Sequence, residues 1–135
     1  MSRLFENYNT PSNEDGFLTG KKFGYAANGS AVTQATNRTT GVTINAPSGT
    51  ITTSSASLAA EAAASFVVTN SSVAIGDVVI ASQQSGAVGV MTQIEVIAIA
   101  AGSFTLAVMN NNPAAGTAET GAILINFAVI KAVSA

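Results

Sequence analysis

The chain has 135 residues, of which 47% are hydrophobic and only 9% are charged, and its formal net charge is −2. This length suits one domain with a real core, and the charged fraction is far below the roughly 25% of an average soluble domain. The five Lys and Arg residues form no basic stripe, which argues against nucleic-acid binding, and the lack of Cys and His removes disulfides, thiolate metal sites and the commonest general base.

Residues 1–38 differ from the rest of the chain and are predicted to form an extended N-terminal arm. The arm holds five of the chain's eight aromatic residues, yet its apolar positions follow neither a helix period nor a strand period. Large rings are unfavourable in water but cannot form a core alone. Three interpretations stay open: the arm packs along its own domain, docks into a neighbouring subunit or partner, or is disordered. If it docks, the expected contact residues are Leu4, Phe5, Tyr8, Phe17, Leu18, Phe23 and Tyr25.

Residues 39–135 predict an all-β domain, an antiparallel β-sandwich or barrel of about seven or eight short strands. Segments 41–45 and 50–53 flank the turn 46–49, which predicts a hairpin. Residues 54–64 have high helix propensity but only one Leu to bury, so we expect a connection with one helical turn at most. The connections are too short for most parallel crossovers. Further strands are expected at 65–69, 76–81, 90–99 (Ile94, Val96 and Ala98 on one face) and 104–108 (Phe104, Leu106 and Val108 on one face).

The C-terminal segment 121–135 is predicted to be the strand around which the domain is organised. Alternation along a strand gives it two apolar faces, one with Ile123, Ile125, Phe127 and Val129, and the other with Leu124, Asn126, Ala128 and Ile130. Since a surface strand of an antiparallel sheet normally keeps one face polar, this strand must be central, sandwiched or covered by another chain. Phe127 is expected in the core, and the expected core or oligomer contacts on the second face are Leu124, Asn126 and Ile130.

No pattern in the chain indicates an active site. Acyl transfer without His would require a Ser–Lys pair, and no Ser-x-x-Lys occurs. The segment 86–89 lacks the strand, helix and Lys of a phosphate loop. We therefore expect no catalysis, no cofactor and no metal site. Carboxylates solvated at the surface or in turns are expected at Glu61, Asp77, Glu95 and Glu119.

Self-association has better support in the sequence. The two-faced terminal strand, together with the apolar run of Val88, Val90 and Met91, exceeds what one small sandwich can cover. Strand edges without charged residues favour aggregation unless they are paired or buried. A symmetric oligomer with closed cyclic symmetry would cover these surfaces.

Ordered blocks between residues 30 and 135 carry a likeness to a known family. The blocks are TQAT (33–36), TGVTIN (40–45), GTIT (49–52), LAA (58–60), SFVVTNS (65–71), DVV (77–79), AGSF (101–104) and INFAVIK (125–131). In this order they resemble small virion structural proteins of tailed bacteriophages and prophages. Residues 1–30 look particular to this chain, and residues 61–64 stand where the family pattern has a Gly-containing turn.

The resemblance implies a head decoration (cement) protein without catalytic residues. Such proteins sit on the outer surface of the head, commonly as homotrimers, and reinforce contacts between major capsid proteins. The implied partners are the major capsid protein and further copies of this chain, with no nucleic acid and no membrane, and assembly takes place in the host cytoplasm. The first residues lack the apolar core of a secretory signal, which agrees with this route. The alternatives are a tail, collar or fibre component that binds the host surface, and a small binding module or hydrolase unrelated to virions.

Overall fold

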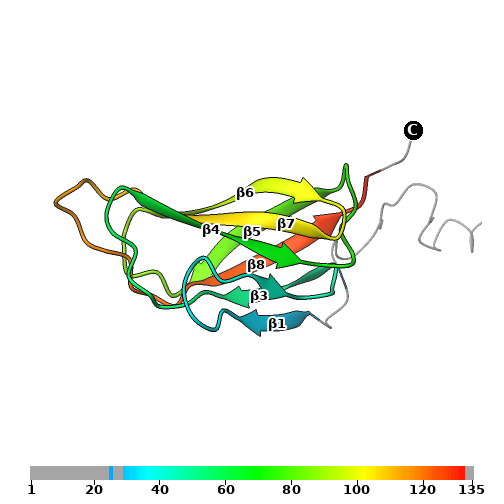
Figure 1. Ribbon diagram of the computed structural model, residues 1–135, viewed down its shortest axis with the longest axis horizontal. Helices are drawn as coiled ribbons and strands as arrows, with labels where there is room; N and C mark the ends of the chain where they lie inside the picture. Colours follow the sequence, from blue (N-terminus) through cyan, green and yellow to red (C-terminus); the bar gives the residue numbers. More distant parts are fainter. Residues whose placement is uncertain (1–24, 26–28, 133–135) are drawn as a thin grey trace, which may run out of the picture.

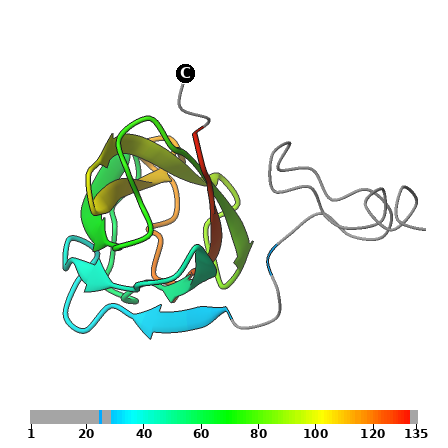
Figure 2. The same ribbon diagram turned by 90° about the vertical axis from the view of Figure 1, so that its right-hand side faces the viewer.

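A computed structural model describes residue 25 and residues 29–132, and this part of the chain contains eight strands and no helix. The strands form two four-stranded sheets that pack face to face (Figures 1 and 2). Sheet A has the order β1-β3-β8-β5, and sheet B has the order β2-β4-β7-β6. The predicted all-β sandwich is confirmed. Its strands are β1 (Ser30–Thr33), β2 (Val42–Thr43), β3 (Ser48–Thr52), β4 (Ala62–Thr69), β5 (Val78–Ser85), β6 (Thr92–Ala100), β7 (Ser103–Asn110) and β8 (Leu124–Ile130).

Both sheets mix antiparallel and parallel pairing. The pairs β3–β8, β5–β8, β4–β7 and β6–β7 are antiparallel, as expected, but β1–β3 and β2–β4 are parallel. Each parallel pair is separated in sequence by one strand of the opposite sheet, so the chain crosses the sandwich and returns. Most pairs are antiparallel, as the short connections predicted. The two parallel pairs arise because a strand of the other sheet provides the long crossover that parallel pairing needs.

The predicted hairpin of 41–45 and 50–53 is also wrong. Strand β2 lies in sheet B and β3 lies in sheet A. The Ile44 amide donates to the Thr69 carbonyl at 3.0 Å, which continues the pairing of β2 with β4. The turn that follows leads the chain across to the other sheet, so the two segments face each other through the core.

The sandwich begins earlier than residue 39. Strand β1 occupies Ser30–Thr33 and pairs with β3. The crossover after it is buried at Gln34 and Arg38, which are 3% exposed each. The Gln34 side chain donates to the Thr40 carbonyl at 2.8 Å and accepts from the Ser54 amide at 3.0 Å. The boundary predicted at residue 38 therefore falls inside the folded body.

Residues 54–64 contain no helical turn. Strand β4 starts at Ala62, so Ala62–Ala64 pairs with residues 108–110 of β7 instead. Glu61, with a φ of 59°, makes the sharp turn into the strand. Pairing along the whole of β7 outweighs the helix propensity of the alanines, because intrinsic propensity is a weak prior against tertiary contacts.

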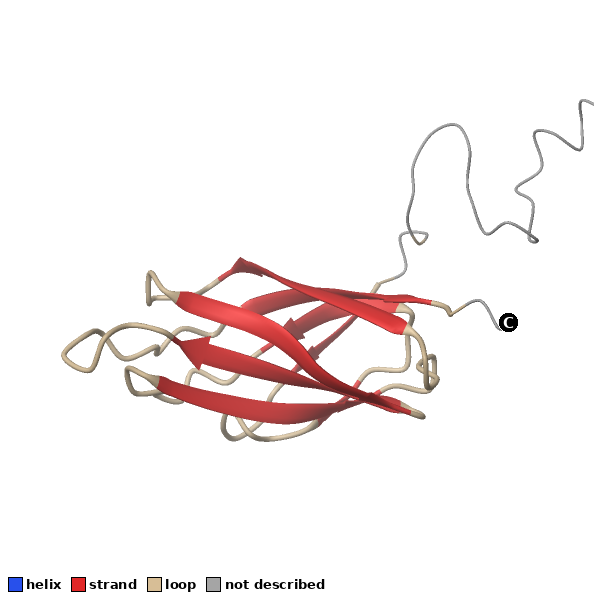
Figure 3. Cartoon of the chain, turned by 90° about the horizontal axis from the view of Figure 1, so that it is seen from above, coloured by secondary structure: helices blue, strands red, loops and turns tan. Residues whose placement is uncertain are grey.

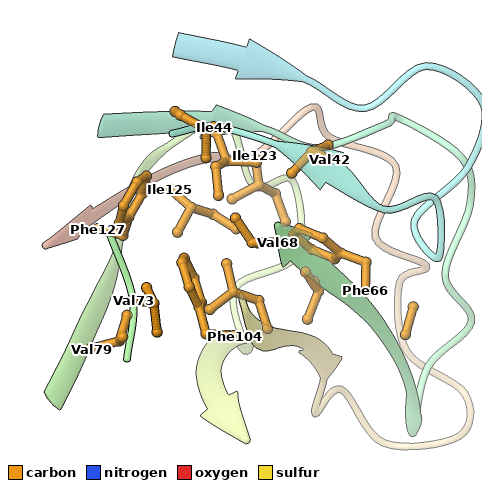
Figure 4. Close-up of a cluster of buried hydrophobic side chains, with 14 of the residues drawn as sticks. Val42, Ile44, Phe66, Val68, Val73, Val79, Phe104, Ile123, Ile125 and Phe127 are labelled. Carbon is orange, nitrogen blue, oxygen red and sulfur yellow. The ribbon is translucent and has the colours of Figure 1, made fainter. Parts of the chain in front are cut away.

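Strand β8 is central in sheet A, between β3 and β5, as one of its predicted settings required. Its inner face supplies the core: Ile123, Ile125 and Val129 are 0% exposed and Phe127 is 4% exposed. Side chains from both sheets meet them (Figure 4), and the rings of Phe104 and Phe127 lie 5.3 Å apart between centroids. The predicted core position of Phe127 is confirmed, as is the buried face of Phe104, Leu106 and Val108.

The edge strand β6 departs from its predicted alternation. Ile94 and Val96 pack against the core, but Ala98 is exposed. The pairing register with β7 shifts between Val96 and Ala98. Such a bulge inserts an extra residue and turns the following side chains to the other face. Ile97, at the bulge, is 52% exposed.

The elongated sandwich has two distinct ends (Figures 1 and 3). At one, the loop end, residues 86–91 join β5 to β6 and residues 111–123 join β7 to β8. At the other, the terminal end, β8 finishes beside the start of β5, with Ile130 opposite Val78. In Figure 1 the orange loop 111–120 marks the loop end and the red tip of β8 marks the terminal end.

Candidate interaction surfaces

The described part of the chain has several exposed apolar side chains on its surface. Within residues 25 and 29–132, no three Asp, Glu, His or Cys side chains gather in a way that could hold a metal ion. Over the same residues, no helix of the length and apolarity needed to cross a membrane is found. The features that stand out are two groups of exposed apolar side chains, one at each end of the sandwich.

The loop-end patch consists of Val88, Val90 and Met91, which are 58%, 93% and 49% exposed. All three belong to the short connection between β5 and β6. The sequence prediction that this run exceeds what the sandwich covers is confirmed. Large side chains with this exposure, clustered on one loop, are typical of a surface that contacts another protein.

A buried carboxylate holds the loop that carries this patch. Glu119 is 0% exposed, and its carboxylate accepts hydrogen bonds from the amides of Val88 and Gly89, both at 2.9 Å. It also accepts from the Gly121 amide at 2.7 Å and from the Thr92 hydroxyl. The Glu119 side chain therefore links three segments: the loop 86–91, the start of β6 and the segment before β8.

Burial alone would raise the pKa of Glu119, but the hydrogen bonds from Thr92, Val88, Gly121 and Gly89 outweigh it and lower the pKa below its ordinary value of 4.5. The carboxylate is thus charged inside the protein. The prediction of a solvated Glu119 was wrong. Its local sequence, Ala-Glu-Thr, is that of a surface turn, and three of its four donors, namely Val88, Gly89 and Thr92, come from a segment about thirty residues earlier in the chain.

Arg38 binds the backbone of the segment that carries Glu119. Its guanidinium donates to the carbonyl oxygens of Glu119 and Gly121 at 3.1 and 2.8 Å, and further bonds reach Ala56 and Thr53. Desolvation lowers the pKa of Arg38, while the charge of Glu119 opposes that shift. Three of these four acceptors are backbone oxygens and the fourth is the Thr53 hydroxyl. Arg38 therefore fixes the path of residues 119–121 and belongs to the sandwich rather than to the arm.

Two amide side chains fix the loop 111–120. Asn110 donates to the carbonyls of Leu58 and Thr117 at 3.1 and 3.0 Å, and Asn112 donates to Thr117 at 3.2 Å. Both side chains are buried. None of the buried side-chain nitrogen and oxygen atoms of the described residues lacks a partner. The loop end is therefore held by polar contacts that are fully satisfied.

A close approach of two backbones also shapes the loop end. Gly86 has a φ of +88°, and a Cβ built there would lie 2.1 Å from the Ala122 carbonyl oxygen. A Cβ on Gly121 would lie 1.9 Å from the Gly86 carbonyl oxygen. Any side chain at either position would push apart the two segments that Glu119 joins.

The second surface lies on the outer face of sheet A at the terminal end. We define the sheet A patch as Val78, Ile80, Ala128 and Ile130, which are neighbours on β5 and β8. Val78 and Ile80 are each 53% exposed and Ile130 is 37% exposed. Sequence reasoning did not single out Val78 and Ile80, although the run Val-Val-Ile-Ala has the same two-faced pattern as the terminal strand.

The predicted residues Leu124, Asn126 and Ile130 all lie on this outer face of β8. Leu124 is half-buried, while Asn126 is exposed and accepts a hydrogen bond from the Thr50 hydroxyl at 3.0 Å. They are therefore not part of the core between the sheets. Their role as oligomer contacts stays a prediction.

Most of the predicted arm contacts, namely Leu4, Phe5, Tyr8, Phe17, Leu18 and Phe23, lie outside the described residues. Tyr25 is described, and it is 46% exposed. Its hydroxyl donates to the backbone carbonyl of Val129 in β8. This contact brings the N-terminal part of the chain to the terminal end of the sandwich.

At the terminal end, an ion pair joins Lys131 and Asp77 at 2.5 Å. Asp77 also accepts from the amides of Ala74 and Ala132 at 2.8 and 2.9 Å. The bonds from Lys131, Ala132 and Ala74 lower the pKa of Asp77 to about 2. The predicted turn chemistry at Asp77 is present, and it also ties the end of β8 to the loop before β5.

No protein-family model matches this chain, and neither the curated proteins nor the solved structures compared with it include a match.

Proposed function

We propose that this chain is a bacteriophage head decoration protein, which binds the outer surface of the capsid and stabilises contacts between major capsid proteins. The observation that carries the proposal is the loop-end patch, three exposed apolar side chains on a loop that a buried carboxylate holds in place. The ordered sequence blocks of residues 30–135 support the same role. In this role the all-β body acts as a rigid structural unit and not as a catalyst.

The physical advantage of this arrangement is preorganisation. A loop that must be ordered on binding loses conformational entropy, and that loss weakens the complex. The hydrogen bonds of Glu119 to Val88 and Gly89 fix the loop before any partner arrives. The apolar side chains can then enter a complementary groove of the capsid at little further cost.

The N-terminal arm supplies a second attachment. When two contacts are linked in one molecule, the second forms at a high effective concentration, and dissociation requires both to break. Expansion of the shell or pressure from packaged DNA would then have to break many such contacts together. A homotrimer would multiply this effect at each site.

The location of the protein in the virion tests the proposal directly. Virions of the phage that encodes this chain should carry hundreds of copies, spread over the head, when they are imaged with a label on the protein. A handful of copies at one vertex, on the tail or on fibres would instead assign it to a tail, collar or fibre structure. Absence from purified virions would exclude both roles.

A substitution pair tests the loop-end patch. Val90 is 93% exposed at the loop end, and Ile75 is 77% exposed near the terminal end. Val90→Asp should abolish binding to undecorated heads. It should not change the melting temperature, because the side chain at position 90 is exposed. Ile75→Asp is the matched control and should bind normally. Normal binding of Val90→Asp would rule out the patch as the capsid contact.

A truncation tests the arm. A chain lacking residues 1–24 keeps Tyr25 and all eight strands. It should still self-associate but no longer decorate heads, as measured by cosedimentation. Decoration at the full level by the shortened chain would show that the arm is not the tether.

A further inference from the structure

The contact of Tyr25 fills a gap in the hydrogen bonding of sheet A. The Val129 amide donates to the Pro47 carbonyl at 2.7 Å, which is half of an antiparallel pair. Proline has no N–H, so Pro47 cannot return the second hydrogen bond to the Val129 carbonyl. The Tyr25 hydroxyl donates to that carbonyl instead. The hydroxyl thus completes the ladder and anchors the chain before β1 at this point.

The anchor lies beside the sheet A patch. Val129 is the neighbour in sequence of Ala128 and Ile130, whose side chains point to the outer face. Across the ladder, Ile130 pairs with Val78 and Ala128 pairs with Ile80. Among the described residues, the charged groups at this corner are Lys131 and Asp77, which pair with each other. The patch is therefore an uncharged apolar surface that includes the two sequence neighbours of Val129, whose carbonyl Tyr25 contacts.

The sequence immediately before the anchor is able to reach this patch. An extended chain spans at most about 3.3–3.6 Å per residue, so Phe23 must lie within roughly 7 Å of Tyr25 and Leu18 within roughly 25 Å. The patch itself spans two adjacent strands about 4.8 Å apart and two residues of each, a rise of about 7 Å. The apolar residues closest to the anchor are Phe17, Leu18 and Phe23.

We propose that residues 17–23 of the same chain cover the sheet A patch, with Phe17, Leu18 and Phe23 against Val78, Ile80 and Ile130. The tether at Tyr25 keeps the segment at a local concentration on the order of millimolar, which a second copy reaches only in concentrated solution. This inference goes beyond the proposed function and does not depend on it. It divides the arm: residues 17–23 cover the sheet A patch, and residues 1–16, with Leu4, Phe5 and Tyr8, stay available for another contact.

Paired cysteines test the placement, since the natural chain has no Cys. The test chain carries Leu18→Cys and Ile80→Cys. The control carries Leu18→Cys and Val67→Cys. Val67 is 48% exposed on the outer face of sheet B, third from the end of β4, just as Ile80 is third from the start of β5 at the same end.

Under mild oxidation in dilute solution, the Ile80→Cys chain should form a disulfide within one molecule about tenfold faster than the control, because docking raises the local concentration. Peptide mapping identifies the bond. Equal rates for the two chains would overturn the placement. Disulfides formed only between two molecules would overturn it as well, since they would assign the patch to a neighbouring copy.

A dye that fluoresces on apolar surfaces gives a second readout. Removal of residues 1–16 should leave dye binding unchanged, whereas removal of residues 1–24 should increase it several-fold by uncovering the patch. Equal dye binding by the full chain and the chain lacking 1–24 would overturn the inference. Neither measurement uses heads, so the inference can fail while the decoration role stands, and the reverse also holds.

Discussion

The two ends of the sandwich are held by different interactions. At the loop end, buried polar side chains, namely Glu119, Arg38, Asn110 and Asn112, bind backbone groups of several loops. At the terminal end, the core is closed by aromatic and aliphatic packing, with the rings of Phe104 and Phe127 in contact. A partly exposed ion pair of Lys131 and Asp77 lies outside that packing.

This difference explains how each end can display apolar side chains. Apolar packing is non-directional, so it stabilises a core but does not fix the path of an exposed loop. Hydrogen bonds to backbone amides do fix a path, and Glu119 places them at the base of the loop-end patch. At the terminal end the exposed residues of the sheet A patch lie on strands β5 and β8, and the buried side chains of Asn70 and Asp77 bond only the short loops around them.

The largest effect is expected from the apolar side of this comparison. Phe127→Ala should destabilise the protein by about 3–5 kcal/mol, because the ring is 4% exposed and its loss creates a cavity in the core. Chemical denaturation measures the change. Leu124→Ala, on the outer face of the same strand, is the control and should cost much less. A near-neutral Phe127→Ala would mean that the faces of β8 are reversed.

Much of the sandwich could be predicted because local alternation marks its central strands. The buried faces of residues 104–108 and 123–129 are visible in the sequence as regular apolar positions. Strands β1 and β2 could not be found in this way. They have four and two residues, and β1 has only one side chain, Val32, that packs against the core. Their parallel pairing depends on segments far along the chain.

The loop-end patch was visible in the sequence, but the network beneath it was not. Val88, Val90 and Met91 are apolar and sit between turn residues, which signals exposure. Glu119 and Arg38 are single charged residues in polar segments, and nothing local separates a buried charge from a solvated one. The nearest signal is scarcity: with charged residues at only 9%, each one has a greater chance of a specific role.

The next largest effect is expected at the loop end, where the buried carboxylate of Glu119 binds backbone amides. Glu119→Gln should destabilise the protein by about 2–3 kcal/mol, because charge-assisted bonds are lost and the amide NH₂ faces backbone donors. Hydrogen exchange at the Val88 and Gly89 amides should accelerate, while exchange in β8 beside β5 should change less. Glu95→Gln, on the exposed side of β6, should be nearly neutral. Unchanged exchange rates at the Val88 and Gly89 amides would show that the Glu119 carboxylate does not hold the loop in place.

Acid should weaken both ends of the sandwich. The pKa values of Glu119 and Asp77 are lowered in the folded state, so the unfolded chain takes up protons first as the pH falls. Their stabilisation is complete above the ordinary pKa values of 4.5 and 3.8 and is lost progressively below them, to about pH 2 for Asp77. Melting temperatures from pH 7 to pH 2.5 should therefore fall below about pH 4.5. Glu119→Gln should make this fall in melting temperature less steep. An identical slope in that variant would show that groups other than Glu119 cause the fall.

The smallest effect is expected at the anchor of the arm. Tyr25→Phe removes only the hydroxyl that donates to the Val129 carbonyl, and one such hydrogen bond contributes about 0.5–1.5 kcal/mol. Tyr8→Phe, the same change at the chain's other tyrosine, should have no effect on the unfolding free energy. The hydroxyl is needed because Pro47 has no N–H, so a second replacement, Pro47→Ala, would provide a competing donor for the same carbonyl. In that background Tyr25→Phe should cost less than in the natural chain. Equal costs in the two backgrounds would show that the tyrosine does not complete the ladder of sheet A.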